Sequence, residues 1–212
     1  MKKLLFLLLA LPLAPVTGLA QQATETPAPQ ATRHDKQFLL DYYRQTAGQL
    51  EKAVAGLSEQ QLHFRRAADK WSISQCLEHI IVTEQTLLGF TRQTMAQAPN
   101  PGRRKDIKLT DEEVIKGITD RSHKVKAPKE VAPSAEGKYS DPAQAIEAFR
   151  KQRNDIVAYI NTLSEEDMRS RITDSPFGPV DAYHSFLYIP GHTARHTLQI
   201  EEIKADKNFP GK

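Results

Sequence analysis

Apolar residues recur every three or four positions in four long segments of the sequence, which is the period of an amphipathic helix. The clearest segment begins at Asp141 and Pro142, a helix cap followed by a first-turn proline. Its apolar face comprises Ile146, Phe149, Ile156, Ile160 and Leu163. Alternating strand patterns are almost absent, so the sequence predicts an all-α fold in which four helices pack as a bundle.

The other three predicted helices also have recognisable ends. The first spans about 35–56 and stops at a glycine, and the second spans about 72–97 and stops at a Pro-rich stretch. Ser72 opens the second helix with a capping box, which satisfies free amides of the first turn. A turn at 176–179 precedes the fourth helix, which spans about 181–205.

The lengths of the connections bear on topology. Residues 57–71 join the first two helices, whereas the much longer stretch 98–140 separates the second from the third. Within it, Thr110 opens another capping box and predicts a short extra helix at about 111–122. A connection this long can cross the length of the bundle, so the second and third helices can run parallel. Spacing alone leaves the topology open.

The N-terminus has the pattern of a secretory signal peptide. Two lysines precede the apolar run 4–16, and small residues lead to a cleavage site after Ala20, so we assign 1–20 to the signal peptide. The alternative is an uncleaved anchor, but the run is shorter than the roughly 20 residues that span a bilayer and contains two prolines. Residues 21–33 are a disordered lead-in by composition. We therefore expect a periplasmic or secreted protein with no membrane span after cleavage.

The remaining length suits one domain, 34–210. Its composition argues against a nucleic-acid partner and against an internal disulfide. Loss of the two N-terminal lysines brings the formal net charge of +3 to about +1, which gives no electrostatic reason to expect nucleic acid as a partner. The single cysteine, Cys76, cannot form an internal disulfide, so the fold depends on packing.

Three histidines are the candidate metal ligands. His192 and His196 are four residues apart, which places both imidazoles on one face of a helix. Such a pair also occurs without a metal, so a third ligand is needed. His79 is the candidate, because its side of the second helix carries apolar or small residues that should face inward, namely Cys76, Val82, Thr83 and Phe90. Three neutral imidazoles predict a divalent metal ion with an open position for water or substrate.

Two segments resemble the motifs of the DinB-like superfamily. Residues 70–80, KWSISQCLEHI, resemble its Trp-Ser opening of a helix that carries one metal histidine. Residues 178–203, with the core HTARHTLQI, resemble its closing motif. The segments 149–153 and 208–210 also resemble the corresponding segments of proteins in this family. The resemblance therefore covers nearly the whole mature chain.

This resemblance implies a fold and a ligand set. The family fold is an up-down-down-up four-helix bundle, and its metal triad falls on His79, His192 and His196 of this sequence. Zinc is our first expectation for the ion and nickel the second, because a tris-imidazole site accepts several transition metals.

Several neighbours of the triad are candidates for supporting roles. Tyr188 and Gln199 share the histidine stripe and are candidates to hydrogen-bond a bound water or a ligand imidazole, with purely structural roles as the alternative. Cys76 is either a soft fourth ligand or a small buried hydrophobe. Arg195 lies off the stripe and is expected to brace the helix. Pro190 predicts a kink just before the first of the two histidines, or even a helix in two pieces.

The reaction stays open at this level. Members of the family have been assigned to hydrolase and to thiol S-transferase chemistry, and both are hypotheses here. Export argues against a cytosolic thiol, and the absence of a carboxylate base from the ligand stripe weakens hydrolysis. The alternative is a non-catalytic bundle that binds metal or small molecules in stress response. The expected partners are a metal ion and a small-molecule substrate, and an unpaired apolar face would allow a homodimer.

Overall fold

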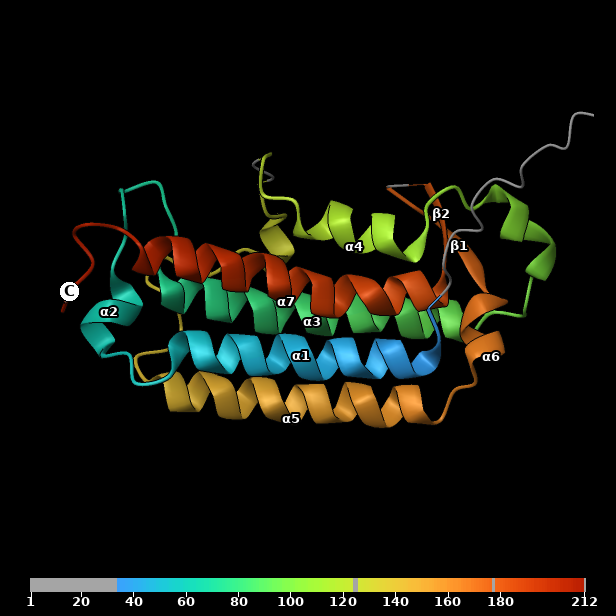
Figure 1. Ribbon diagram of the computed structural model, residues 1–212, viewed down its shortest axis with the longest axis horizontal. Helices are drawn as coiled ribbons and strands as arrows, with labels where there is room; N and C mark the ends of the chain where they lie inside the picture. The colour runs from blue at the N-terminus through green and yellow to red at the C-terminus, as the bar shows by residue number, and fades with distance from the viewer. Residues whose placement is uncertain (1–33, 124–125, 177, 212) are drawn as a thin grey trace, which may run out of the picture. The chain divides into compact units, whose positions relative to one another are not determined.

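Four long helices form the body of the protein in the computed structural model, which describes residues 34–123, 126–176 and 178–211. They are α1 (Lys36–Val54), α3 (Ile73–Met95), α5 (Pro142–Asn161) and α7 (Ala182–Lys204), shown in Figure 1. Shorter helical segments occupy the connections: α2 (Glu59–His63), η1 (Pro101–Asp106), α4 (Asp111–Thr119), η2 (Lys129–Val131) and α6 (Glu165–Arg169). The predicted four-helix bundle is confirmed.

The predictions for the N-terminus lie outside the described residues. The signal peptide at 1–20 and the lead-in at 21–33 therefore stay predictions. Within the described ranges, no helix combines the length and the apolar character that crossing a membrane requires.

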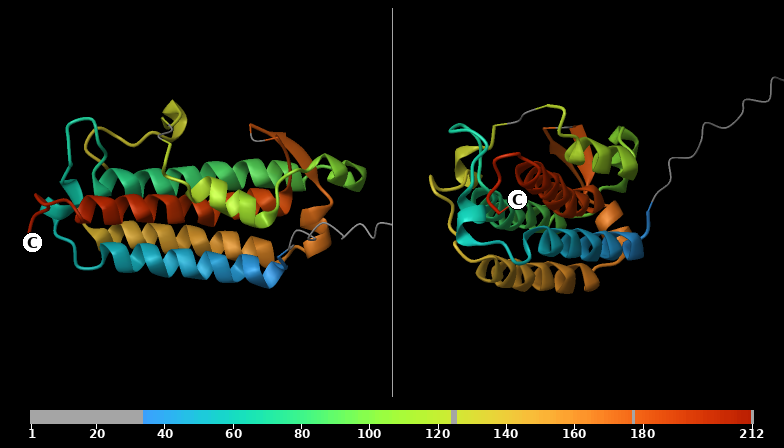
Figure 2. Two further views of the ribbon diagram at one scale, coloured as in Figure 1. Left: turned by 45° about the horizontal axis from the view of Figure 1, so that its top comes forward. Right: turned by 60° about the vertical axis from the view of Figure 1, so that its left-hand side comes forward.

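The helices run up, down, down and up. In Figure 1, α1 and α7 run in one direction, while α3 and α5 run in the other. The chain therefore returns along the length of the bundle between α3 and α5, and α4 lies on this return path. Figure 2 shows α4 outside the four-helix body beside α7, with which it is in contact. The parallel second and third helices that the long connection allowed are thus present.

Local capping chemistry explains where the helices begin. Asp35, Asp141 and Asp181 accept amide hydrogen bonds at the N-termini of α1, α5 and α7, respectively. The predicted capping boxes at Ser72 and Thr110 are both present. Because each cap satisfies backbone donors that the helix itself leaves free, the sequence fixes these starts to within a residue.

A short β-hairpin precedes α7, where the sequence analysis predicted only a turn. Strand β1 (Ile172–Ser175) pairs antiparallel with β2 (Gly178–Asp181), in a register that places Ile172 opposite Asp181. The strand sequences ITDS and GPVD do not alternate apolar with polar residues, so no strand pattern was detectable. The hairpin delivers Asp181 to the position from which it caps α7.

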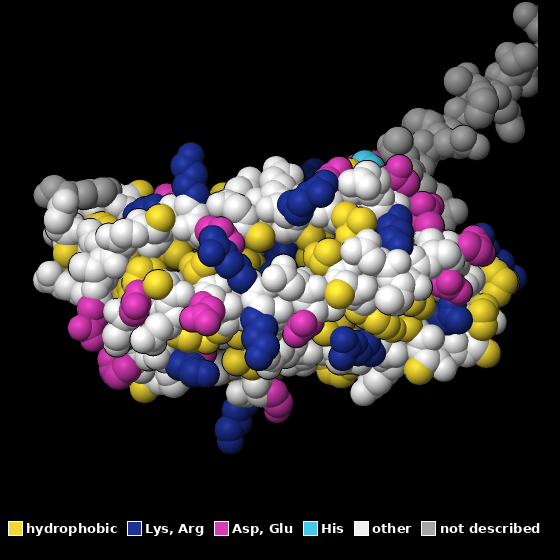
Figure 3. Space-filling model, turned by 90° about the horizontal axis from the view of Figure 1, so that it is seen from below, with side chains coloured by type: hydrophobic (Ala, Val, Ile, Leu, Met, Phe, Trp, Pro, Cys, Tyr) yellow, Lys and Arg dark blue, Asp and Glu magenta, His cyan; other side chains and the backbone are white. Residues whose placement is uncertain are grey.

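A buried ion pair joins all four long helices between two apolar clusters. Arg153 of α5 and Glu84 of α3 are 2.6 Å apart at their closest, with side chains 5% and 0% exposed. Arg153 also donates to the carbonyl oxygen of Tyr43 in α1 and to the hydroxyl of Thr193 in α7. By contrast, basic and acidic side chains are interspersed on the outer face in Figure 3. The interior pair is therefore the polar centre of the bundle.

Helix α7 continues without interruption through Pro190, so the two-piece alternative does not hold. Next to it, Gly191 lies directly under α4. A Cβ atom at Gly191 would lie 2.3 Å from Cγ2 of Ile118, which is shorter than any normal contact. Glycine at this position is what lets α4 pack against the helix that carries two of the histidines.

We expect Gly191→Ala to be less stable than Gly48→Ala by about 1–3 kcal/mol, because both variants gain helix propensity but only the methyl group at 191 overpacks the contact with Ile118. Gly48→Ala is the matched control, since no atom lies within 4 Å of its added Cβ. Urea unfolding should show the control at or above wild-type stability. Equal stability of both variants would contradict the close packing of α4 on α7.

We expect Glu84→Gln to lower the free energy of unfolding by about 3–5 kcal/mol, because it leaves the buried charge of Arg153 without a counter-charge. Glu51→Gln removes the acidic partner of Arg150 from a more exposed pair and should change stability by less than about 1 kcal/mol. Comparable losses in the two variants would mean that the interior pair has no special role.

Candidate metal centre

Two helices bring the three predicted histidines together. His79 comes from α3, while His192 and His196 come from successive turns of α7. One nitrogen atom from each ring lies within 4.8 Å of the others, and the Nε2 atoms of His79 and His192 are 3.1 Å apart. Among the histidine, cysteine, aspartate and glutamate side chains of the described residues, these three histidines form the group whose spacing suits a single ion.

Hydrogen bonds fix how two of the rings present their nitrogen atoms. Nδ1 of His79 lies 2.7 Å from the carbonyl oxygen of Val131, which can only accept, so Nδ1 carries the proton. Nδ1 of His196 lies 2.9 Å from Oε1 of Gln199. In both rings the Nε2 lone pair is left for a ligand bond, the arrangement typical of metal-binding histidines. Nδ1 of His192 is buried, with no hydrogen-bond partner within the described ranges.

The surroundings keep the three rings neutral. Burial lowers the pKa of His79, lowers that of His192 well below its usual value, and lowers the pKa of His196 to about 3. The indole of Trp71 packs on the group, 4.8 Å from the ring centre of His79 and 6.0 Å from that of His196. Neutral imidazoles are the form that binds a metal ion, so the site is ready for one at neutral pH.

Residues 120–123, which follow α4, are attached to α7. Arg195 donates hydrogen bonds to the carbonyl oxygens of Asp120 and His123, so it braces the helix as expected, through backbone oxygen atoms. Arg121 forms a bidentate ion pair with Glu202, with both N–O distances 2.7 Å. These contacts hold this segment against the face of α7 that carries the histidines.

The other predicted neighbours occupy different places. Cys76 is fully buried in an apolar cluster, and burial raises the pKa of its thiol to about 12, which fits a small hydrophobe better than a ligand. Burial also raises the pKa of Tyr188, partly offset by a hydrogen bond with Ser175, so its hydroxyl lies toward β1. A hydrogen bond from Tyr188 to a bound water or a ligand imidazole stays a prediction, whereas Gln199 contacts His196 directly.

Sequence reasoning missed two buried polar groups. One is the ion pair of Arg153, although this residue lies between Phe149 and Ile156 on the apolar stripe, a spacing that signals burial. The other lies at the N-terminal end of α7, where Arg169 contacts both Asp111 and Asp181, and His184 contacts Asp111. Its members are far apart in sequence, so no local pattern identifies it.

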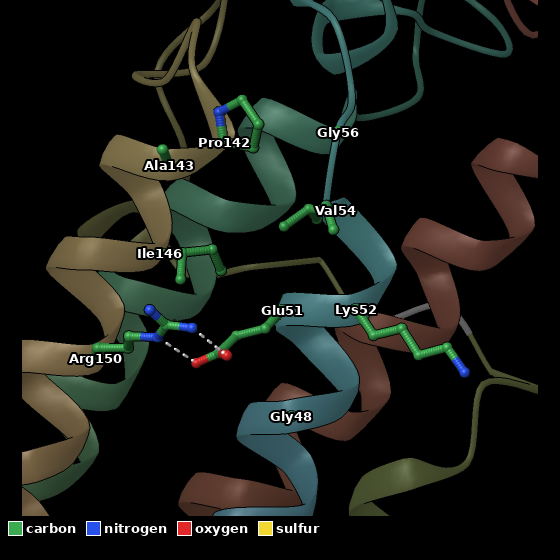
Figure 4. Close-up of a pocket in the computed structure, with 10 residues that line it drawn as sticks. Gly48, Glu51, Lys52, Val54, Gly56, Pro142, Ala143, Ile146 and Arg150 are labelled. Carbon is green, nitrogen blue, oxygen red and sulfur yellow. Dashed lines mark hydrogen bonds and ion pairs between the residues drawn. The ribbon is translucent and has the colours of Figure 1, made fainter.

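A surface groove of about 510 Å³ lies elsewhere on the molecule, between the end of α1 and the start of α5 (Figure 4). Val54, Pro142 and Ile146 contribute apolar walls, and the ion pair of Glu51 with Arg150 crosses it. None of the residues that line it belongs to the histidine group, so the groove is a separate feature.

Three comparisons with known proteins each found a match. The family model of the DinB superfamily matches residues 20–200. The uncharacterised protein YuaE of Bacillus subtilis (strain 168) is 27% identical over 151 residues, which is 71% of this chain and 88% of YuaE. The structure of YfiT from Bacillus subtilis, a probable metal-dependent hydrolase with an unusual four-helix bundle topology, matches with a TM-score of 0.56. At 14% identity, over 84% of this chain and 90% of YfiT, this is a likeness of fold.

The low pKa of His196, about 3 against an ordinary 6.5, predicts how stability depends on pH. Below pH 6.5 the unfolded chain binds a proton that the folded site does not. The free energy of unfolding of the metal-free protein therefore decreases as the pH is lowered. This one group should contribute a loss of about 2 kcal/mol between about pH 7 and pH 5. Urea unfolding of metal-free wild type and His196→Gln tests it, and identical pH dependence in both would contradict it.

Proposed function

The chain belongs to the DinB superfamily, and from this premise we propose that it is a metal-dependent hydrolase whose ion is held by His79, His192 and His196. The observation that carries the proposal is the convergence of three neutral imidazoles, two of them with Nδ1 already hydrogen-bonded. An all-nitrogen set of this kind suits zinc, nickel or copper, with zinc as the first candidate and nickel as the second.

The donor set fits a reactive ion better than a purely structural one. Three protein ligands would leave a bound divalent ion with a free coordination position, and such an ion would supply activation of water and polarisation of a carbonyl group. The chain's own residues orient the ligands: Val131 holds His79, and Gln199 holds His196. Trp71 limits the access of bulk water to the rings. An ester or amide is the substrate class that such chemistry serves.

Three carboxylates on the helices that carry the triad already have hydrogen-bond or ion-pair partners. Glu78 accepts hydrogen bonds from Ser134, Glu84 is paired with Arg153, and Glu202 is paired with Arg121. None of these three carboxylates is free to act as the general base in a hydrolytic step.

We also propose that the protein acts outside the cytoplasm, in the periplasm or as a secreted protein. The support is the pattern of residues 1–20, with two lysines, an apolar run and small residues before the cleavage site. This location favours hydrolysis over transfer of a cytosolic thiol.

One observation favours a second function, non-catalytic metal binding. Trp71 packs over the rings of His79 and His196, and the groove in Figure 4 lies away from them. An enzyme needs a cleft that leads substrate to the ion. A metal-loaded protein that cleaves no ester or amide would support this second function.

We expect the mature protein, residues 21–212, to contain about one equivalent of transition metal per chain, and the triple variant of His79, His192 and His196 to alanine to contain none. Elemental analysis of protein purified without a metal-binding tag measures this. His123→Ala is the matched control, because this histidine is exposed and lies outside the triad. No metal in wild type, even after incubation with zinc or nickel, would contradict the proposal.

A further inference from the structure

His196 and His79 differ in how their ring tautomers are fixed. His79 faces a backbone carbonyl, which has no hydrogen to donate, so its Nδ1 must be the protonated nitrogen. His196 faces the side-chain amide of Gln199, which has an oxygen acceptor at one end and an NH₂ donor at the other. If the amide turned over, its NH₂ group would face Nδ1 of His196, and the ring would carry its proton on Nε2. That tautomer has no lone pair for a metal ion at Nε2.

A third residue decides which end of the amide faces the ring. Nη1 of Arg121 donates to Oε1 of Gln199 at 3.3 Å, and this is the same oxygen atom that meets Nδ1 of His196. A guanidinium group only donates hydrogen bonds. The reversed amide would set its NH₂ group against the guanidinium, which also only donates, and Arg121 would lose an acceptor.

Arg121 is itself held in place. It follows the end of α4, and its Nε and Nη2 atoms donate to the two carboxylate oxygens of Glu202. Gln199 and Glu202 are three residues apart on α7, so the guanidinium spans neighbouring turns of the helix that carries His196. Its planar, bidentate fork fixes the direction in which the remaining donor points.

We propose that Arg121 is a positioning residue for the metal centre, which selects the Nδ1-protonated tautomer of His196 by orienting the amide of Gln199. The inference rests on the proposed metal-binding function for its purpose. Arg121 acts through Gln199 and does not need to touch the ion. The connection after α4 thereby takes part in preparing a ligand on α7.

The direct test is the tautomer of His196 in metal-free protein, measured from the ring ¹⁵N shifts of histidine-labelled samples above the ordinary histidine pKa of about 6.5. In wild type we expect the proton on Nδ1. In Arg121→Met, which keeps the apolar stem and removes the donors, we expect a clear shift toward the Nε2-protonated form. Unchanged shifts in the variant, or an Nε2-protonated wild type, would overturn the inference.

Two further variants separate this role from a general loosening of the connection. Arg150→Met is the matched control, because Arg150 makes the same bidentate pair with Glu51 (Figure 4), on two helices that carry none of the three histidines. It should leave the tautomer unchanged. Adding Gln199→Glu to Arg121→Met should restore the proton to Nδ1, because a carboxylate only accepts. Failure of this rescue would also count against the inference.

Zinc affinity is measured separately from the tautomer of His196. We expect Arg121→Met to weaken zinc affinity about tenfold, as for other residues that orient a ligand from outside the coordination shell, and Arg150→Met to leave it unchanged. If wild type bound no zinc, the proposed function would fail, while the ring shifts of the metal-free protein would still decide the role of Arg121.

Discussion

The ion pair of Arg153 and Glu84 is the interaction on which the arrangement of the bundle depends. Arg153 reaches α1 through Tyr43, α3 through Glu84 and α7 through Thr193, from its own position on α5. Two charges in an apolar interior are costly unless each has partners in the right geometry. Any change in the relative height or rotation of the four helices would break several of these contacts at once.

This network bears on the metal centre because Thr193 follows His192 directly. The hydroxyl of Thr193 donates to Glu84 at 2.5 Å and accepts from Arg153 at 2.7 Å. The turn of α7 that carries His192 is thus tied to α3, the helix that carries His79. Gly191 attaches the same turn to α4 from the other side. The rings are therefore placed by a rigid interior, as a site that binds an ion in one geometry requires.

The parts of this structure that could be predicted from the sequence are those with local causes. The helix starts at Ser72 and Thr110 follow from capping boxes within four residues, and His192 and His196 share a face because of the helical period alone. The inward direction of His79 followed from Cys76 and Thr83, which are buried, whereas Phe90, which also marked this face, is 60% exposed. The family resemblance supplied the order of the helices, which connection length had left open.

The remaining features depend on contacts between distant segments. The partner of Arg153 is 69 residues away, and the oxygen atom that Arg121 shares with His196 is 78 residues away. No periodicity encodes such pairs, although the position of Arg153 on an apolar stripe marks it as unusual. The β-hairpin was missed for a local reason, since its strand sequences do not alternate apolar with polar residues. One metal ion held by His79, His192 and His196 is nevertheless the central claim, and both the sequence and the structure bring these three residues together.

X-ray absorption spectroscopy of the zinc-loaded mature protein tests that claim most directly, because it reports the atoms that surround the ion. We predict three imidazole nitrogens at about 2.0–2.1 Å, together with a light atom in the remaining position. A sulfur ligand at about 2.3 Å, which would have to come from Cys76 or from a methionine, or fewer than three imidazoles would contradict the account.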